Sequence, residues 1–150
     1  MAYIEIDSGP YLVMPKEKAF DKGERPVNIV PSNLVWLKHA QTSWITPHTS
    51  ESPSPEIAFL WGNPSAQQKS GSFLRLPNTF KGEIKSQNGL LRIVVVKGQL
   101  NDTQDPILTL SPGEFFTIKD NQSMPIQTEA DNDCTLYIHA DGAYTVTTAE

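Results

Sequence analysis

Three polar side chains near the middle of the chain have the types and spacing of a small ligand site. Glu83, Lys85 and Gln87 stand two residues apart in the stretch "KGEIKSQ". Side chains two apart on a β-strand share one face, so a carboxylate, an ammonium group and an amide would line one surface. Such a set could bind a polar organic molecule. The alternative is a solvated face with Ile84 pointing inward, because burying an unpaired lysine is costly.

A single arginine interrupts the most apolar run of the chain. Arg92 lies in "LLRIVVVKG", and Arg75 in "FLRLP" has a similar setting. Each could be paired at the mouth of a barrel or lie on a sheet surface that faces a partner. An ion pair with a nearby Asp or Glu is the usual role of an isolated arginine in a strand, so neither is expected to be catalytic.

The remaining reactive side chains form no recognisable catalytic or metal-binding set. His39, His48 and His139 are far apart in the sequence, and Cys134 is the only cysteine. Cys134 lies in the strand-like run "DCTLYIHA", which favours a buried, inert thiol. The serines of "DSG", "TSW" and "SGS" lack a nearby histidine, and no Gly-rich loop precedes a helix. We therefore expect neither a catalytic residue nor a metal.

Composition excludes several kinds of partner. The 150 residues suit one domain, and the net charge of -5 comes without any basic cluster, so nucleic acid is not expected to bind. No apolar stretch approaches the roughly 18 residues of a membrane span. The start "MAYIEIDSGP" lacks the basic and apolar regions of a signal peptide. We expect a cytoplasmic protein, or a periplasmic one if a leader has been removed.

The elements that position these residues are predicted to be strands. Helical periodicity is almost absent, and short β-rich runs alternate with stretches rich in Gly, Pro, Asn, Asp and Ser, which is typical of an antiparallel sandwich or barrel. The runs expected to form strands are 3–6, 11–13, 27–30, 35–39, 57–61, 72–77, 79–85, 90–100, 107–110, 114–118, 125–129, 135–139 and 144–147. A tight turn is expected at Pro112-Gly113.

Two long segments resemble the cupin superfamily. They are "SGSFLRLPNTFKGEIKSQNGLLRIVVVKGQL" and "LTLSPGEFFTIKDNQSMPIQTEADNDCTLYIHADG", and "FLWGNP" and "NIVPSNLVWL" before them add to the likeness. The chain is similar to the degenerate second cupin of uncharacterised two-cupin proteins related to the sensor domains of anti-sigma factors. The resemblance implies an all-β, RmlC-like jelly-roll barrel over residues 27–150. Residues 1–26 would form an extra N-terminal strand and linker.

The resemblance also implies where a metal would be held. Active cupins carry two histidines near the positions of Lys85 and Gln87, a glutamate near Arg92 or Ile93, and a third histidine near Ile126. None of these residues is a histidine or a carboxylate here, so no divalent metal cofactor is expected. The ligand-binding set expected instead comprises residues near the emptied site and an aromatic residue beside the barrel: Trp61, Glu83, Lys85, Gln87, Arg92 and Ile126.

Three functions stay open on these grounds. The first is a non-catalytic module that binds a small polar ligand or acts as a structural or regulatory part. The second is a cupin enzyme of the dioxygenase, isomerase or lyase type, acting on a small polar or sugar-like substrate. The third is a regulatory partner domain, although the barrel ligands of anti-sigma sensors and their helical sigma-binding segment are missing.

The chain begins with a stretch that resembles its end. "YIEIDSGPYLV" (Tyr3 to Val13) is similar to "YIHADGAYTV" (Tyr137 to Val146). We interpret it as the last strand of a preceding cupin unit. A lone strand with an alternating apolar face requires a sheet edge, and this one should fit beside a C-terminal strand. We therefore expect a homodimer formed by addition or exchange of the N-terminal strand.

Overall fold

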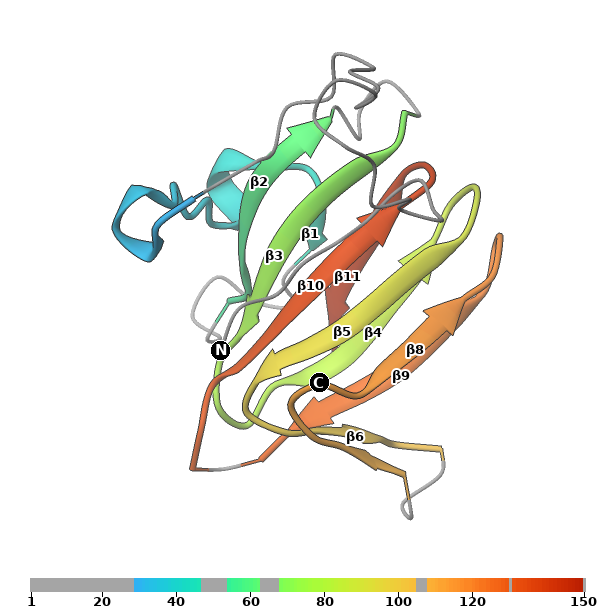
Figure 1. The fold of residues 1–150 in the computed structure, drawn as a ribbon. Coiled ribbons are helices and arrows are strands. Elements are labelled where there is room, and N and C mark those ends of the chain that lie inside the picture. Colours follow the sequence, from blue (N-terminus) through green and yellow to red (C-terminus); the bar gives the residue numbers. More distant parts are fainter. Residues whose placement is uncertain (1–28, 47–53, 63–67, 105–107, 130, 150) are drawn as a thin grey trace, which may run out of the picture.

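Two β-sheets stacked face to face make up almost all of the regular structure (Figure 1). The computed structural model describes residues 29–46, 54–62, 68–104, 108–129 and 131–149. Sheet A has the strand order β2-β3-β10-β5-β8, and sheet B has the order β1-β11-β4-β9-β6-β7. The strands are β1 (Ile45–Thr46), β2 (Glu56–Gly62), β3 (Ser70–Leu76), β4 (Lys81–Ser86), β5 (Leu91–Lys97), β6 (Leu100–Asp102), β7 (Thr109–Leu110), β8 (Phe115–Ile118), β9 (Ser123–Thr128), β10 (Cys134–Ala140) and β11 (Tyr144–Thr148). The predicted all-β architecture is confirmed.

The core lies between the sheets and follows the alternation of their strands. Ile84 of β4 and Ile126 of β9 meet Ile93 of β5 and Leu136 and Ile138 of β10, and each of these side chains is completely buried. Burying one such side chain contributes roughly 1.5–3 kcal/mol. The sandwich is therefore held together by branched aliphatic side chains that fill its interior.

Most predicted strands form, with shifted ends, and the exceptions have local causes. The run 90–100 divides into β5 and β6 because Gly98 has a φ of +80°, and a Cβ there would lie 2.5 Å from the Asp133 carbonyl oxygen. The predicted turn at Pro112-Gly113 is present, with the Glu114 amide donating to the Ser111 carbonyl oxygen at 3.0 Å.

The segment before the sandwich differs from its prediction. Residues 35–39 form only a bridge from Leu37 to Ile57, and short 3-10 turns occupy Pro31–Asn33 (η2) and His39–Gln41 (η3). Ile29 and Val30 are not in a strand either. The predicted strands at 3–6 and 11–13 lie outside the described residues, so the boundary between 1–26 and 27–150 stays a prediction. No helix in the described ranges is long and apolar enough to cross a membrane.

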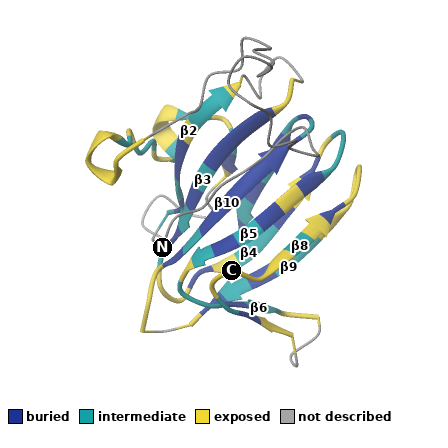
Figure 2. Ribbon diagram, in the orientation of Figure 1, coloured by how far each residue is buried: buried dark blue, intermediate teal, exposed yellow. Residues whose placement is uncertain are grey.

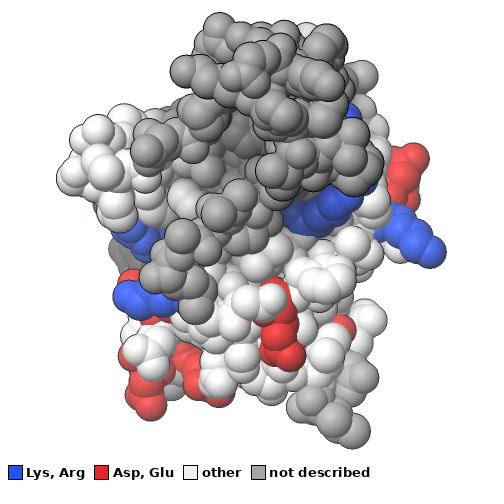
Figure 3. All heavy atoms as spheres, in the orientation of Figure 1, with Lys and Arg blue, Asp and Glu red and all other residues white. Residues whose placement is uncertain are grey.

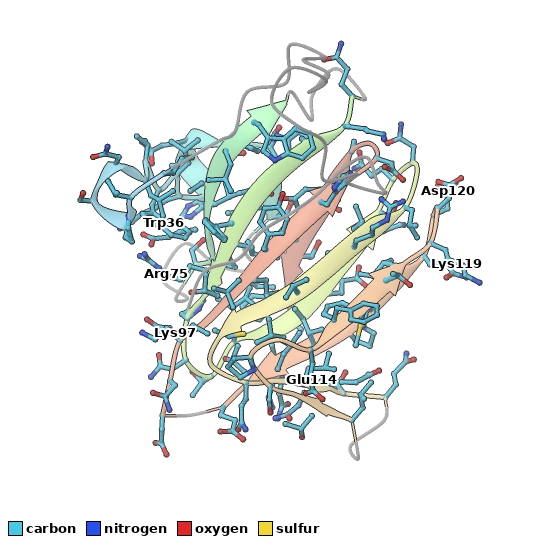
Figure 4. The ribbon with its side chains drawn as sticks, in the orientation of Figure 1. Trp36, Arg75, Lys97, Glu114, Lys119 and Asp120 are labelled. Carbon is cyan, nitrogen blue, oxygen red and sulfur yellow. The ribbon has the colours of Figure 1, made fainter. Side chains whose placement is uncertain are left out.

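Arg75 attaches this leading segment to the outer face of sheet A (Figure 4). Its guanidinium carbon lies 3.9 Å from the centre of the Trp36 ring, and its Nη1 donates to Glu56 Oε2 at 2.9 Å. Stacking of a guanidinium on an indole face contributes about 0.5–1 kcal/mol at exposed sites. The ion pair expected for this arginine is thus present, combined with an aromatic contact.

Tyr144 joins the two sheets through the core. Its side chain starts on β11 of sheet B, and its hydroxyl lies 2.6 Å from the Ser72 hydroxyl on β3 of sheet A. Tyr144 is 1% exposed and Ser72 is completely buried. Burial raises the pKa of Tyr144 above its ordinary value, because the charged phenolate would lose its hydration.

The buried thiol generates a first prediction. Cys134 is completely buried and unbonded, as expected, and burial raises the pKa of its thiol to about 12. In the unfolded chain the thiol ionises at a lower pH, with a pKa near 9. The thiol therefore does not reduce the free energy of unfolding below pH 9, and it lowers this free energy progressively as the pH rises from 9 toward 12. In that pH range the unfolding free energy of the wild type should fall by about 1.4 kcal/mol per pH unit more than that of Cys134→Ala.

Urea unfolding of both proteins between pH 7 and 11 measures this difference. The ionisation of Tyr144 also changes stability at high pH, but it contributes equally to both proteins and cancels in the comparison. A thiol reagent should react with native Cys134 no faster than the protein unfolds. Parallel stability curves, or rapid labelling of the folded protein, would contradict the buried thiol.

Candidate functional site

The predicted polar triplet lies on the outside of the barrel. Ile84 and Ser86 of β4 point into the interior, whereas Lys85 is exposed and Glu83 is half-buried on the outer face of sheet B. Gln87 follows β4 in a turn and is exposed. Of the two alternatives that the sequence left open, the solvated face with Ile84 pointing inward is therefore the one that forms. An ammonium group stays in water here because the core offers it no partner. A ligand role on this outer surface stays a prediction.

Ile126 occupies the interior, as its predicted position implies, but as part of the packing. It is completely buried in the core cluster together with Ile84 and Ile93. Aliphatic carbons have no lone pairs for a cation, so these interior residues do not fit a divalent metal. In the described part of the chain, no group of three or more His, Cys, Asp or Glu side chains could hold a metal ion.

Trp61 and Arg92, by contrast, lie on the same surface. The strand registers align Trp61 of β2 with Gly71 of β3, Gly71 with His139 of β10, and His139 with Arg92 of β5. These residues form one row across the outer face of sheet A. Trp61 and His139 contact edge to face, with ring centres 5.4 Å apart and an angle of 81° between the rings.

A second row adds further aromatic contacts to this face. Phe73 of β3 pairs with Tyr137 of β10, and their rings pack edge to face at 5.7 Å. The Trp61 indole Nε1 donates to the Tyr137 hydroxyl at 3.2 Å, which links the two rows. Tyr137 is only 3% exposed and His139 only 6%, and Figure 2 shows β10 buried along most of its length.

The charged end of the row is an ion pair. Arg92 Nη1 donates to both carboxylate oxygens of Asp141 at 3.2 Å. His139 Nε2 lies 3.6 Å from Asp141 Oδ1, so a protonated imidazole would add a second positive charge beside the carboxylate. The ion pair expected for Arg92 is present, and it lies on a sheet surface.

Gly71 makes this arrangement possible. A Cβ on Gly71 would lie 2.1 Å from Trp61 Nε1 and 2.6 Å from the Tyr137 hydroxyl oxygen. The missing side chain lets the indole lie across β3 and reach β10. We call the set of side chains around this glycine the outer-face cluster, and it comprises Trp61, Phe73, Arg92, Tyr137, His139 and Asp141.

The chain carries a signal for the part of the cluster that the sequence reasoning missed. Tyr137, His139 and Asp141 are spaced by two in "YIHAD", so they extend along one side of β10 and the turn that follows it. The apolar residues between them face the core. Only the pairing of β10 with its neighbours places them beside Trp61 and Arg92.

The described surface that is visible on the sheet A side of the molecule is mostly uncharged. Figure 3 views the molecule from the side of sheet A, and its described residues are largely neutral between separate basic and acidic groups. A shallow polar groove of about 430 Å³ lies elsewhere, over β4, β6 and β9. Its described lining contains no aromatic side chain: Thr79, Lys81, Asn101, Gln127, Thr128, Glu129 and Asp131.

The two-layer β-fold with a packed interior is that of the cupin-like proteins, as solved structures confirm. A cupin-like protein of unknown function from Ralstonia eutropha matches with a TM-score of 0.60 and 12% identity, over 82% of this chain and 77% of that one. The polyketide cyclase RemF from Streptomyces resistomycificus matches with a TM-score of 0.56 and 14% identity, over 75% and 77%.

The likeness extends to the anti-sigma proteins. A structure of Rhodobacter sphaeroides SigE in complex with the anti-sigma ChrR matches with a TM-score of 0.52 and 14% identity, over 74% of this chain and 51% of that one. A comparison with curated proteins finds no match. By sequence, residues 1–147 match DUF4437, a domain of unknown function, and the chain belongs to this family.

The glycine gives a direct test of the outer-face cluster. Gly71→Ala should displace Trp61, because the new methyl group and the indole cannot occupy the same space. We expect a loss of about 1–3 kcal/mol in unfolding free energy, the usual cost of overpacking, and a changed tryptophan emission maximum. In a Trp61→Leu background the same change should cost clearly less. Equal costs in both backgrounds, by urea unfolding, would refute the contact.

Proposed function

We propose that the protein is a non-catalytic binding module that works without the usual cupin metal, and that its ligand binds the outer-face cluster. The observation that supports this most is the separation of the two surfaces of sheet A. The interior side carries mainly apolar core packing, whereas the outer side gathers three aromatic rings, an imidazole and an ion pair around Gly71.

The burial of polar groups on this outer face supports the same proposal. A sheet face turned away from the core normally carries solvated side chains. Here the polar Tyr137 and His139 are both more than nine-tenths buried. Buried polar groups are normally held by specific partners, and here the Trp61 indole bonds to the Tyr137 hydroxyl while the Asp141 carboxylate lies beside the His139 ring.

A second candidate is an enzyme that acts at the same surface. What favours it is the proximity of His139 to Asp141, at 3.6 Å, because a carboxylate can orient an imidazole for proton transfer. Against it, Asp141 is already paired with Arg92, which reduces its influence on the imidazole. The cupin-like fold alone does not decide between the two, because one fold supports many activities.

A measurement of metal content distinguishes the proposed metal-free binding module from a metal-dependent cupin. We expect the purified protein to contain well below one equivalent of iron, manganese, zinc, nickel or copper by mass spectrometry. Treatment with a chelator should leave its melting temperature unchanged, because aliphatic side chains fill the interior. A stoichiometric metal, or a chelator-induced fall of several degrees, would contradict the proposal.

We also propose that two copies associate through the N-terminal strand. Both sides of β10 are already hydrogen-bonded, to β3 and β5, so an added strand cannot lie beside β10 as the sequence suggested. The edge strand β8 pairs only with β5 among the described strands, and its Phe115 is 71% exposed. This edge fits strand addition by the segment Tyr3 to Val13 of a second copy.

Deletion and surface variants test this association by light scattering after gel filtration. Removing residues 1–13 should convert a dimer into a monomer, and Phe115→Asp should weaken the dimer at least tenfold. Val35→Asp is the matched control, because Val35 is exposed to the same extent, 72%, but lies outside the sheets. A dimer that persists after the deletion would refute the role of the strand.

A further inference from the structure

The guanidinium of Arg92 has one edge that its ion pair does not use. Both of its hydrogen bonds to Asp141 come from Nη1. Among the described residues, no hydrogen bond engages Nε or Nη2, and the side chain is 48% exposed. These two nitrogens present parallel N–H groups, and this is the geometry with which arginine holds a planar carboxylate.

The neighbouring groups offer aromatic surface in place of further polar contacts. The Trp61 N–H already donates to the buried Tyr137 hydroxyl, so Trp61 offers a ligand mainly its ring surface. His139 lies between Trp61 and Arg92 in the cross-strand row. The Trp61 ring reaches His139 on β10, and β5 with Arg92 lies one strand spacing of about 4.8 Å further, so a ligand with one ring and one acidic group can contact both Trp61 and Arg92.

The charge of Asp141 beside Arg92 further restricts the class of ligand that can bind. Asp141 holds the guanidinium in place, but it also leaves the pair with no net charge. Because Asp141 neutralises the guanidinium, no excess positive charge favours a dianion such as phosphate over a monoanion. A sugar would need several free hydrogen-bonding groups, and two of the nearest ones are engaged with each other.

We infer that the outer-face cluster binds a planar aromatic monocarboxylate, with its carboxylate on Nε and Nη2 of Arg92 and its ring against the partly exposed face of Trp61. This inference rests on the proposed function and names its ligand class. Arg92 provides the charge-assisted hydrogen bonds, and Trp61 provides an aromatic contact that a saturated ring would not match. Gly71 keeps the indole within reach of β10.

Titration with benzoate, followed by nuclear magnetic resonance of the indole and backbone amide signals, tests the inference. Benzoate should bind saturably, and benzyl alcohol, which lacks the charge, should bind at least tenfold more weakly. Cyclohexanecarboxylate, which lacks the aromatic ring, should bind several-fold more weakly. Inorganic phosphate and glucose should cause no saturable shift.

Variants assign the binding to the two residues. Arg92→Gln should weaken benzoate binding about tenfold, the usual loss for a charge-assisted hydrogen-bond pair, and Arg92→Lys should restore it only in part. Trp61→Leu should reduce the preference for benzoate over cyclohexanecarboxylate. The matched control is Lys119→Gln, an exposed basic residue that follows β8 and lies outside the outer-face cluster, which should bind benzoate like wild type. Melting temperatures confirm that each variant is folded.

The outcomes separate the ligand class from the proposed function. If benzoate fails to bind, or binds Arg92→Gln as tightly as wild type, the inference is overturned. If glucose or phosphate binds instead and Arg92→Gln abolishes that binding, the ligand class is wrong but the outer-face cluster remains the site. If a ligand binds with no dependence on Arg92 or Trp61, both the inference and the proposed function fail.

Discussion

The register of β10 is the constraint on which both faces of sheet A depend. This strand pairs with β3 on one side and β5 on the other, so its side chains are fixed to one face or the other along its length. Leu136 and Ile138 enter the core, and Tyr137 and His139 join the outer-face cluster. A shift of one residue would exchange the two sets. Burial of the apolar side chains in the core therefore determines where the polar and aromatic side chains of β10 lie on the outer face.

Close packing of the core also determines the chemical character of the barrel interior, which is mainly apolar among the described residues. An interior metal needs polar ligands and some space, whereas close packing of aliphatic side chains leaves neither. Ile84, Ile93 and Ile126 meet here with no exposed surface. Replacing one of them by a histidine would remove apolar contacts and bury a polar ring. The apolar packing of the described interior therefore contributes mainly to stability.

The sequence predicted the strands well and the site only in part, for physical reasons. Alternation and turn residues are local signals, so most strands and the Pro112-Gly113 turn could be located from them. Whether Lys85 or Ile84 points inward depends on which face of β4 meets the core, and a one-residue shift reverses the answer. The cost of burying an ammonium group was the better guide to that choice than alignment to the cupin motif. Trp61 was predicted as an aromatic residue beside the barrel, and Arg92 as an ion pair at the barrel mouth or on a sheet surface, but the two were not predicted to share one surface.

Their association could not be predicted because it depends on contacts between residues far apart in the chain. Trp61 reaches Tyr137 only because β3 carries a glycine at the crossing point, and this requirement appears only when the two strands are placed side by side. Arg92 reaches Asp141 across the pairing of β5 with β10. Each residue has an ordinary role when considered alone, as an aromatic surface group or as an ion pair. Together they place an indole ring, two buried polar side chains and the Arg92 guanidinium on one surface, an arrangement that local sequence signals alone do not reveal.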